Sequence, residues 1–378
     1  MNFPIYLDFN ATTPVAPEVA AAMRPWMDEQ FGNPSSSHVY GQQAQKAVAK
    51  ARESVAALIG AQAREIVFTG SATEANNLAL LGVARAMPPN KRHLIVSAIE
   101  HPAVMQPALH LREEGWDLTV LPVDGYGHIV LDDLRAALRP CTALVSVMHA
   151  NNEVGTIHPV AEIAALARAN GSLMHTDAAQ SAGKVTLDVV ALGVDLLTLA
   201  GHKFYGPKGI GALYVRRGTA IRPILFGADQ EHGLRPGTEN VTHIVGLGEA
   251  TRLARVRLPH ATQHLATLRD DLHRRLADAV PGLILNGHPE QRLPNTLHVS
   301  FPGVSGRDLL AAAREVAASV GSACHSDADA VSGVLAAMDC SASRARGAVR
   351  LSVGFPTTGK DVYAAASILV SAWRALAP

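Results

Sequence analysis

The chain has 378 residues, of which 48% are hydrophobic and 17% are charged. Lysine and arginine together number 33, as do aspartate and glutamate, so no net positive field would attract a nucleic acid or an anionic membrane surface. The length is enough for one large α/β domain and a smaller second domain.

The N-terminus, MNFPIYLDFNATTP, lacks the basic start and apolar run of a secretory signal peptide, and no segment reaches the roughly 18 apolar residues of a membrane helix. Cys141, Cys324 and Cys340 are far apart in the sequence. Three cysteines at such spacing disfavour a disulfide framework and a zinc site, and they fit a reducing compartment. We therefore expect a cytoplasmic protein with no metal, nucleic acid or membrane partner.

Short apolar runs alternate with helix-patterned segments between residues 65 and 216. The predicted strands are Ile66–Thr69, His93–Ala98, Leu118–Pro122, Ala143–Met148, Leu173–His175, Leu196–Leu199 and Gly211–Val215. Helical periodicity covers Glu74–Ala86, Val104–Glu113 and Val160–Ala169. This alternation predicts an α/β domain with a mainly parallel seven-stranded sheet and helices on both faces.

The pattern changes near residue 242, where a long helix begins that extends to Leu276. Beyond it the predicted strands are Leu283–Leu285, Thr296–Ser300 and Val349–Leu351, with helices at Arg307–Glu315 and Asp361–Ala375. These elements predict a smaller α+β domain. We place the large domain at residues 16–255, and the small domain at residues 1–15 together with 256–378.

Lys203 lies in a turn rich in glycine and proline, directly after a predicted strand, in LAGHKFYGPKG. A lysine at the end of a buried strand is costly unless it is paired or used covalently. Lysines that form Schiff bases occupy such partly desolvated places, because a lowered pKa leaves the amine nucleophilic. An ordinary loop lysine fits the local pattern equally well.

Asp177 closes another predicted strand, in HTDAAQ. In a parallel sheet the carboxyl ends of the strands share one edge, where ligands bind. Pyridoxal phosphate needs a carboxylate at its ring nitrogen, since protonation there makes the ring an electron sink. An aspartate that only caps the next turn is the alternative, and taken alone it is the commoner one.

Further polar groups follow neighbouring strands. The turn FTGSATEANN leads into a helix that begins around Thr73, and helix starts of this kind bind phosphate. His101 and the pair Asn151 and Asn152 follow two other strands. Each group is weak evidence by itself, but all of them fall at the same edge of one predicted sheet.

Several segments also carry a family resemblance. They are FGNPSSSH, GSATEANN, HANNEVGT, HTDAAQ, GHKFYGPKGIGALYVRR, RPGTENV and GSACHSD. Together they resemble the cysteine desulfurases, which are fold-type I pyridoxal-phosphate enzymes of the class V aminotransferase group. The similarity runs in order from YLDFNATTP to VRLSVGFPTT. Selenocysteine lyases belong to the same family, and the segment SVGSACHSD is similar to theirs, whereas EHPAV is more similar to desulfurases of the nitrogen-fixation type.

The resemblance implies a role for each matching residue around pyridoxal phosphate. Lys203 would hold the cofactor covalently, Asp177 would pair with its ring nitrogen, and His101 would stack on the ring as a further catalytic residue. Asn152 and Gln180 would contact the ring substituents, with Asn152 also near the substrate.

The phosphate and substrate groups are implied in the same way. Ala72, Thr73 and His202 would hold the phosphate, and Thr238 would reach it from the second subunit of a homodimer. Arg350 would bind the substrate carboxylate through a bidentate fork. Cys324 would be the nucleophile that accepts sulfur.

The chain departs from the family pattern at four places. Ala200 stands where a phosphate-binding serine is usual, and Gly70 and Ser71 invert the usual order. Ala228 replaces a glycine, and Phe355 replaces an arginine. The first two put one phosphate contact in doubt, and none of the four alters the residues that carry the chemistry.

The implied activity converts L-cysteine to L-alanine, with the sulfur held on Cys324 as a persulfide and passed to an acceptor protein, as in iron–sulfur cluster assembly. A lyase acting on L-selenocysteine is the main alternative. An aminotransferase on the same fold would need a ketoacid and would have no use for Cys324. A non-catalytic sulfur-transfer scaffold is disfavoured, because loss of catalysis usually removes groups such as Lys203 and Asp177 first.

Overall fold

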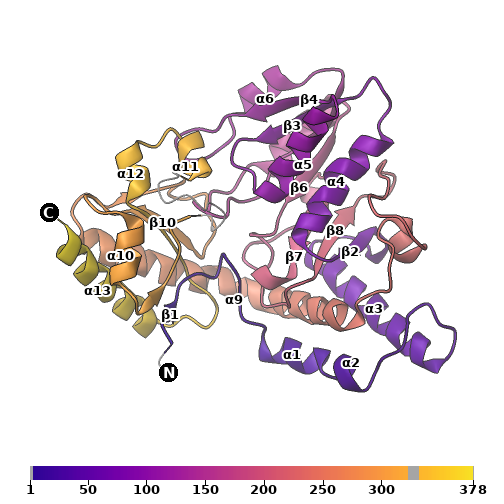
Figure 1. Ribbon diagram of the computed structural model, residues 1–378, viewed down its shortest axis with the longest axis horizontal. Helices are drawn as coiled ribbons and strands as arrows, with labels where there is room; N and C mark the ends of the chain where they lie inside the picture. Colours follow the sequence, from indigo (N-terminus) through magenta and orange to yellow (C-terminus); the bar gives the residue numbers. More distant parts are fainter. Residues whose placement is uncertain (1–2, 322–331, 378) are drawn as a thin grey trace.

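The computed structural model describes residues 3–321 and 332–377 of the chain (Figure 1). Its central element is a seven-stranded sheet with the order β2-β8-β7-β6-β5-β3-β4. The strands are β2 (Ile66–Thr69), β3 (His93–Ser97), β4 (Asp117–Leu121), β5 (Thr142–Ser146), β6 (Leu173–Asp177), β7 (Leu196–Ala200) and β8 (Gly211–Val215). Strand β8 pairs antiparallel with both β2 and β7, and the other pairs in this sheet are parallel. The predicted mainly parallel sheet is confirmed.

Both faces of the sheet are buried, and successive strand residues enter different cores. In β3, Leu94 and Val96 join one hydrophobic cluster and Ile95 joins another. The first cluster includes residues of α4 (Ala72–Ala86) and α5 (Pro102–Glu113), while the second includes residues of α3 (Val39–Leu58) and α7 (Val160–Ala169). Since side chains alternate along a strand, continuous apolar runs need helices on both sides.

Shorter helices complete the sheet domain. They are α1 (Pro17–Met23), α2 (Pro25–Asp28), α6 (Leu131–Ala137) and α8 (Val189–Leu192), with 3₁₀ turns η1 (Ala63–Glu65), η2 (Gly201–Lys203) and η3 (Gln230–Gly233). Among the residues described, no helix is long and apolar enough to cross a bilayer.

The C-terminal part is built on a three-stranded sheet in which β10 (Thr296–Ser300) lies between β9 (Ile284–Leu285) and β12 (Ala348–Ser352). The helices here are α10 (Gly306–Ala312), α11 (Gly333–Ala337), α12 (Ala342–Arg346) and α13 (Gly359–Leu376). The N-terminal strand β1 (Ile5–Tyr6) pairs in parallel with β11 (Val316–Ala317). Chain start and chain end therefore lie in the same part of the molecule (Figure 1).

The helix predicted at Arg307–Glu315 is too long at its C-terminal end, because α10 ends at Ala312. The next residues are drawn into strand β11, where Val316 pairs with Ile5. That partner lies more than 300 residues away in sequence, so local periodicity does not reveal it.

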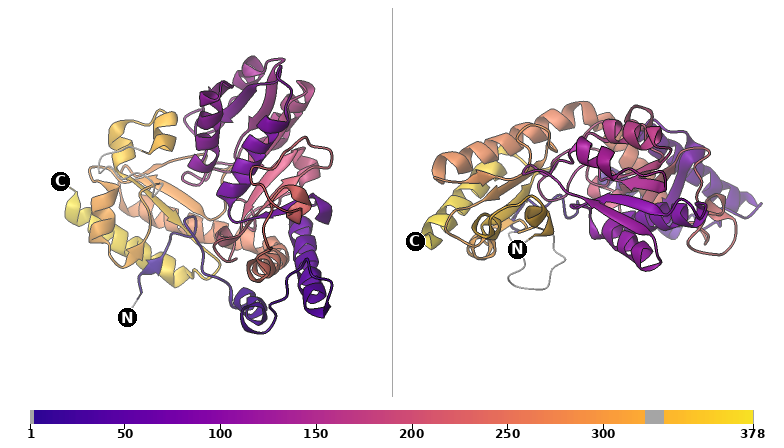
Figure 2. Two further views of the ribbon diagram at one scale, coloured as in Figure 1. Left: turned by 45° about the vertical axis from the view of Figure 1, so that its right-hand side comes forward. Right: turned by 90° about the horizontal axis from the view of Figure 1, so that it is seen from above.

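Helix α9 (Val241–Ala279) connects the two parts of the molecule (Figures 1 and 2). Its Leu253 and Ala254 belong to the core under the large sheet, whereas Leu265 and Leu268 belong to the core of the C-terminal part. This division supports the boundary that we propose near residue 255, within one continuous helix.

Candidate active site

A cavity of about 290 Å³ opens at the carboxyl ends of β6 and β7, beside the N-terminus of α4. Nine of the predicted site residues line it: Ala72, Thr73, His101, Asn152, Asp177, Gln180, His202, Lys203 and Arg350. They come from separate segments spread over some 280 residues of sequence, and the parallel sheet brings most of them to one edge, as its topology predicts.

Lys203 ends the 3₁₀ turn η2, which directly follows β7. Its Nζ donates to the carbonyl oxygens of Asn10 and Ala11, at 2.7 and 2.9 Å. The amine is therefore held at the cavity wall by two backbone acceptors of the N-terminal segment. Neither acceptor is charged, so the lysine is not committed to an ion pair with them.

Asp177 is the last residue of β6 and is 6% exposed. Its Oδ2 accepts from Asn76 Nδ2 at 2.7 Å, and its Oδ1 accepts from the backbone N–H of Ala179 at 2.9 Å. One donor on each oxygen fixes the plane of the carboxylate. A buried carboxylate with a fixed orientation can stabilise a positive charge placed against it.

His101 is the N-cap of α5, and its Nδ1 accepts from the backbone N–H of Ala103 at 3.1 Å. Burial lowers the pKa of His101, and the nearby Lys203 lowers it further, while Asp177 opposes the shift. The ring is therefore neutral over most of the physiological range, with its proton on Nε2 because Nδ1 acts as an acceptor.

The first turn of α4 forms an anion seat. Ser71 caps this helix by accepting from the backbone N–H of Glu74 at 3.1 Å, and the N–H groups of Ala72 and Thr73 have no intrahelical acceptor. Strand β8 comes very close at Gly211, where a Cβ would lie 2.7 Å from the carbonyl carbon of Ser71. Only glycine leaves room for this approach.

His202 precedes Lys203 in the chain and lines the same cavity. Its Nδ1 is 3.2 Å from Thr12 Oγ1. Burial and then the charge of Lys203 lower the pKa of His202 to about 4. A neutral His202 can donate one hydrogen bond to an anion, although it adds no charge.

Arg350 lies in β12 and is 4% exposed. Its Nη2 donates to Asp8 Oδ1 at 2.8 Å, and its Nη1 donates to the carbonyl oxygen of Asn152 at 3.0 Å. Its Nε is buried and has no hydrogen-bond partner among the residues described. A guanidinium in this position can still bind a carboxylate ligand, which would compete with Asp8 for its N–H donors.

The aminotransferase class-V family model matches residues 5–364 of the chain. The chain belongs to this family.

Curated relatives narrow the position within the family. The chain is 44% identical to "Cysteine desulfurase IscS" of Dictyoglomus turgidum over 364 residues, which are 96% of this chain and 92% of the relative. It is 46% identical to the protein of the same name from Methanosarcina thermophila, over 96% of this chain and 90% of the relative.

Solved structures agree in fold. A structure described as a NifS-like protein has a TM-score of 0.92 at 37% identity and covers 98% of this chain and 99% of its own. The NifS-like protein from Rickettsia africae has a TM-score of 0.88 at 29% identity, with 98% and 99% coverage. The family resemblance and the fold class predicted from the sequence are confirmed.

Two predicted site residues are not among those that line the cavity. Thr238 lies on an exposed loop before α9. Cys324 lies outside the described residues. The roles predicted for both, and those of the nine residues in the cavity, stay predictions.

Three contributing residues were given no role from the sequence, namely Asn10, Asn76 and Asp8. Asn76 holds Asp177, and Asp8 pairs with Arg350. Asn10 is 1% exposed and contacts both parts of the molecule. Their only signal in the sequence is their place within YLDFNATTP and GSATEANN, because their partners are more than 100 residues away.

Proposed function

We propose that this protein is a pyridoxal-phosphate-dependent cysteine desulfurase that converts L-cysteine to L-alanine. The observation that carries the proposal is one cavity that joins an amine, a fixed carboxylate, a helix N-terminus and a buried arginine. Relatives that are 44–46% identical over nearly the whole chain and are named cysteine desulfurases support the same activity.

The donor set of the cavity fits pyridoxal phosphate. Asp177 would face the ring nitrogen, the first turn of α4 and His202 would hold the phosphate, and Lys203 would bind the aldehyde carbon. Asn76 also lines this cavity, and its Oδ1 is buried without a hydrogen-bond partner among the described residues. This oxygen could therefore accept a hydrogen bond from a bound ligand. When bound, the cofactor supplies an electron sink for negative charge at the substrate Cα.

The residues around this ring would position the substrate and move its protons. Arg350 would hold the substrate carboxylate, and its neighbour Asn152 would limit how that carboxylate turns. Lys203 would take the proton from Cα, since it lines the same cavity as Arg350. His101, neutral and protonated on Nε2, would exchange a proton with the substrate or the leaving sulfur.

We assign sulfur acceptance to Cys324. L-Cysteine and the Cys324 thiol would give L-alanine and a Cys324 persulfide, so that the Cβ–S bond breaks and an S–S bond forms. The thiolate is the nucleophilic form. The described residues that flank this segment support the assignment. Ser319 pairs with Arg350, and Ser332 Oγ donates to Glu153 at 2.5 Å, so both ends start near the cavity.

The other two cysteines are less suited to sulfur transfer. Cys141 and Cys340 are both half-buried. Burial raises the pKa of the Cys340 thiol, which reduces the thiolate fraction at neutral pH. Neither residue lines the cavity.

We further propose a cytoplasmic homodimer in which Thr238 contributes to the phosphate site of the partner subunit. Exposed aromatic side chains support association, because such groups commonly mark interfaces. Phe226 is 84% exposed, and Phe31 is 79% exposed although its ring stacks on Tyr40. A sulfur-acceptor protein would then collect the persulfide sulfur.

The test is turnover of L-cysteine with alanine measured as the product. Cys324→Ala should still bind pyridoxal phosphate but should release alanine at a small fraction of the wild-type rate. Cys340→Ala and Cys141→Ala are matched controls and should keep that rate. Cys324→Ala should reduce the turnover of L-selenocysteine less than that of L-cysteine, because selenium leaves more readily. Wild-type turnover of cysteine by the Cys324→Ala variant would refute the assignment.

A further inference from the structure

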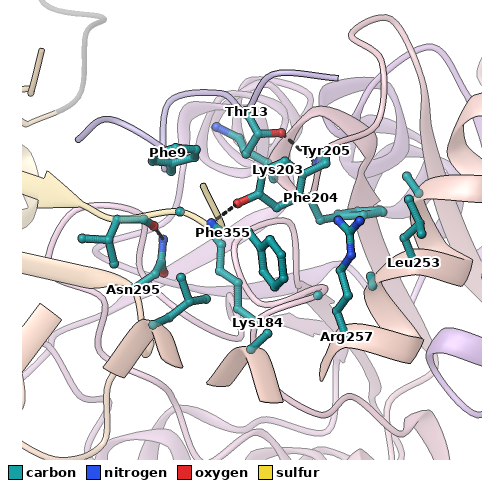
Figure 3. Close-up of a pocket in the computed structure, with 17 residues that line it drawn as sticks. Phe9, Thr13, Lys184, Lys203, Phe204, Tyr205, Leu253, Arg257, Asn295 and Phe355 are labelled. Atoms are coloured by element: carbon teal, nitrogen blue, oxygen red, sulfur yellow. Dashed lines mark hydrogen bonds between the residues drawn. The ribbon is translucent and has the colours of Figure 1, made fainter. Parts of the chain in front are cut away.

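A buried lysine lies behind the candidate active site. Lys184 follows β6 in the turn that begins at Asp177, and it is 6% exposed. It lines a second, mostly apolar cavity, which it shares with Lys203 and Asn295 (Figure 3). Lys184 is not among the residues that line the cavity that we assign to the cofactor. No step of the proposed function uses it.

Within the described part of the chain, Lys184 donates to two neutral side-chain amides. Its Nζ donates to Gln180 Oε1 at 3.1 Å and to Asn10 Oδ1 at 3.4 Å. Both amides are buried, since Gln180 is 6% exposed and Asn10 is 1% exposed. A lysine kept inside a protein by uncharged acceptors alone is costly, because the contacts do not compensate a charge.

Gln180 transmits this contact to the site. Its Nε2 donates to the carbonyl oxygen of Asn10 at 3.0 Å, and the same oxygen accepts from Lys203 Nζ at 2.7 Å. Gln180 also lines the cavity that holds Asp177 and Lys203. Its oxygen is thus occupied by Lys184, and one hydrogen of its nitrogen is occupied by Asn10.

We propose that Lys184 is a positioning residue that fixes the orientation of the Gln180 amide, so that Gln180 presents an N–H donor to an oxygen substituent of the bound cofactor ring. This inference rests on the proposed function, because it needs a ligand in the cavity. A primary amide has two N–H donors and one acceptor oxygen. With the oxygen and one N–H engaged, only the second N–H remains to face a ligand. Without Lys184, the hydrogen bond to the carbonyl of Asn10 is the only one among the described residues that opposes rotation of the amide. A rotated amide would offer its oxygen, which would repel an oxygen substituent.

The chemistry of Lys184 suits a donor that need not be charged. Burial, followed by the charges of Lys203 and Arg350, lowers the pKa of Lys184 to about 7. A neutral amine still has two N–H donors, one for each of its two amide acceptors. The contact with Gln180 therefore persists whether or not Lys184 carries a proton.

The experiment measures binding of pyridoxal phosphate to the apoprotein, by titration and by the visible spectrum of the complex. Lys184→Met keeps the long apolar stem and removes the donor. We expect its dissociation constant to rise about tenfold, as for the loss of one well-formed hydrogen bond in a buried site. Lys184→Arg should retain part of the affinity because it keeps a donor. Lys360→Met, an exposed lysine on α13, is the matched control and should bind as the wild type does.

A double-mutant cycle separates positioning from a general structural role. If Lys184 acts through Gln180, then Lys184→Met should weaken binding much less in a Gln180→Ala background than in the wild type. Equal losses in both backgrounds would overturn the inference, and so would unchanged binding by the single variant. If Lys184→Met fails to fold, Lys184→Gln takes its place in the same cycle. Failure of the wild-type apoprotein to bind pyridoxal phosphate would instead overturn the proposed function.

Discussion

Lys203 Nζ donates a 2.7 Å hydrogen bond to the carbonyl oxygen of Asn10, a residue 193 positions earlier in the chain. The Asn10 side chain reaches in the other direction, where its Nδ2 donates to Thr296 Oγ1 at 2.9 Å and its Oδ1 accepts from Asn295 at 3.0 Å. One N-terminal residue thus joins the lysine of the large sheet domain to strand β10 of the C-terminal part. The geometry of the site depends on this connection between domains.

Asn10→Ala should therefore destabilise the protein and weaken the domain contact. The variant removes one hydrogen bond from each of Asn295, Thr296 and the carbonyl of Asn152, although each keeps one other partner. A hydrogen bond contributes about 0.5–1.5 kcal/mol to stability, so we expect the loss of these three to cost a few kcal/mol. Urea unfolding checks this, with the exposed Asn90→Ala as control. An unfolding midpoint equal to that of the control would contradict the connecting role.

His158 should make the protein sensitive to acid. It is 3% exposed, and neither of its ring nitrogens has a hydrogen-bond partner within the described part of the chain. Burial, with the neighbouring His128 and His149, lowers its pKa from 6.5 to about 3. Between these values the unfolded state binds a proton that the folded state does not, so stability falls as the pH falls.

The measurement compares His158→Leu with the wild type by urea unfolding at pH 7 and at pH 4. Leucine keeps a similar volume without a titrating group, so the variant should lose less stability over this range, by up to a few kcal/mol. His175 and His298, whose pKa values are also lowered to about 3 by burial, remain in both proteins. Equal pH dependence of variant and wild type would show that His158 is not buried as a neutral ring.

Glu100 should give stability the opposite pH dependence to that given by His158. Burial raises its pKa to about 8, although Ser97 and the backbone N–H of Met148 donate to its Oε1, and Asp177 raises the pKa further. Between pH 4.5 and 8 the folded state holds a proton that the unfolded state has lost, so stability falls as the pH rises. Glu100→Gln keeps a neutral group of the same shape and should be more stable than the wild type, increasingly so from pH 5 to 8. A constant difference across that range would contradict a protonated Glu100.

The sequence predicts the sheet well because most of its strands are short, buried apolar runs with turn residues between them. It also predicts the site residues that stand directly after strands, such as Asp177 and Lys203, since parallel topology alone brings strand ends together. These residues share one cavity.

Other parts depend on contacts between distant segments, which local patterns do not encode. The short pairing of β1 with β11 ends α10 early, and Asn10 enters the site only because β1 is fixed in the C-terminal part. In the sequence, Lys184 looks like an ordinary turn lysine within QSAGKV. Its importance becomes visible only when Gln180 and Asn10 are placed around its amine.

Thr238 allows a test of whether two subunits share each site. It is exposed and is not among the residues that line the cavity of its own chain. Its loop is nevertheless held against the turn that precedes α4. Arg235 Nε donates to Glu74 Oε1 at 2.9 Å, and Glu74 Oε2 accepts from the backbone N–H of Gly70. We expect Thr238→Ala to weaken binding of pyridoxal phosphate about tenfold, by loss of one hydrogen bond to the phosphate.

Subunit mixing then decides where Thr238 acts. Thr238→Ala and Lys203→Ala chains are unfolded together, refolded in equal amounts and assayed for tight binding of pyridoxal phosphate. In a dimer with shared sites, each hybrid has one site that combines an intact Lys203 with an intact Thr238 from the other subunit. Random pairing makes about a quarter of all sites intact, although neither parent has any. If Thr238 acts within its own chain, or if the chains do not associate, the mixture shows only the average of the two parents, and the shared site is refuted.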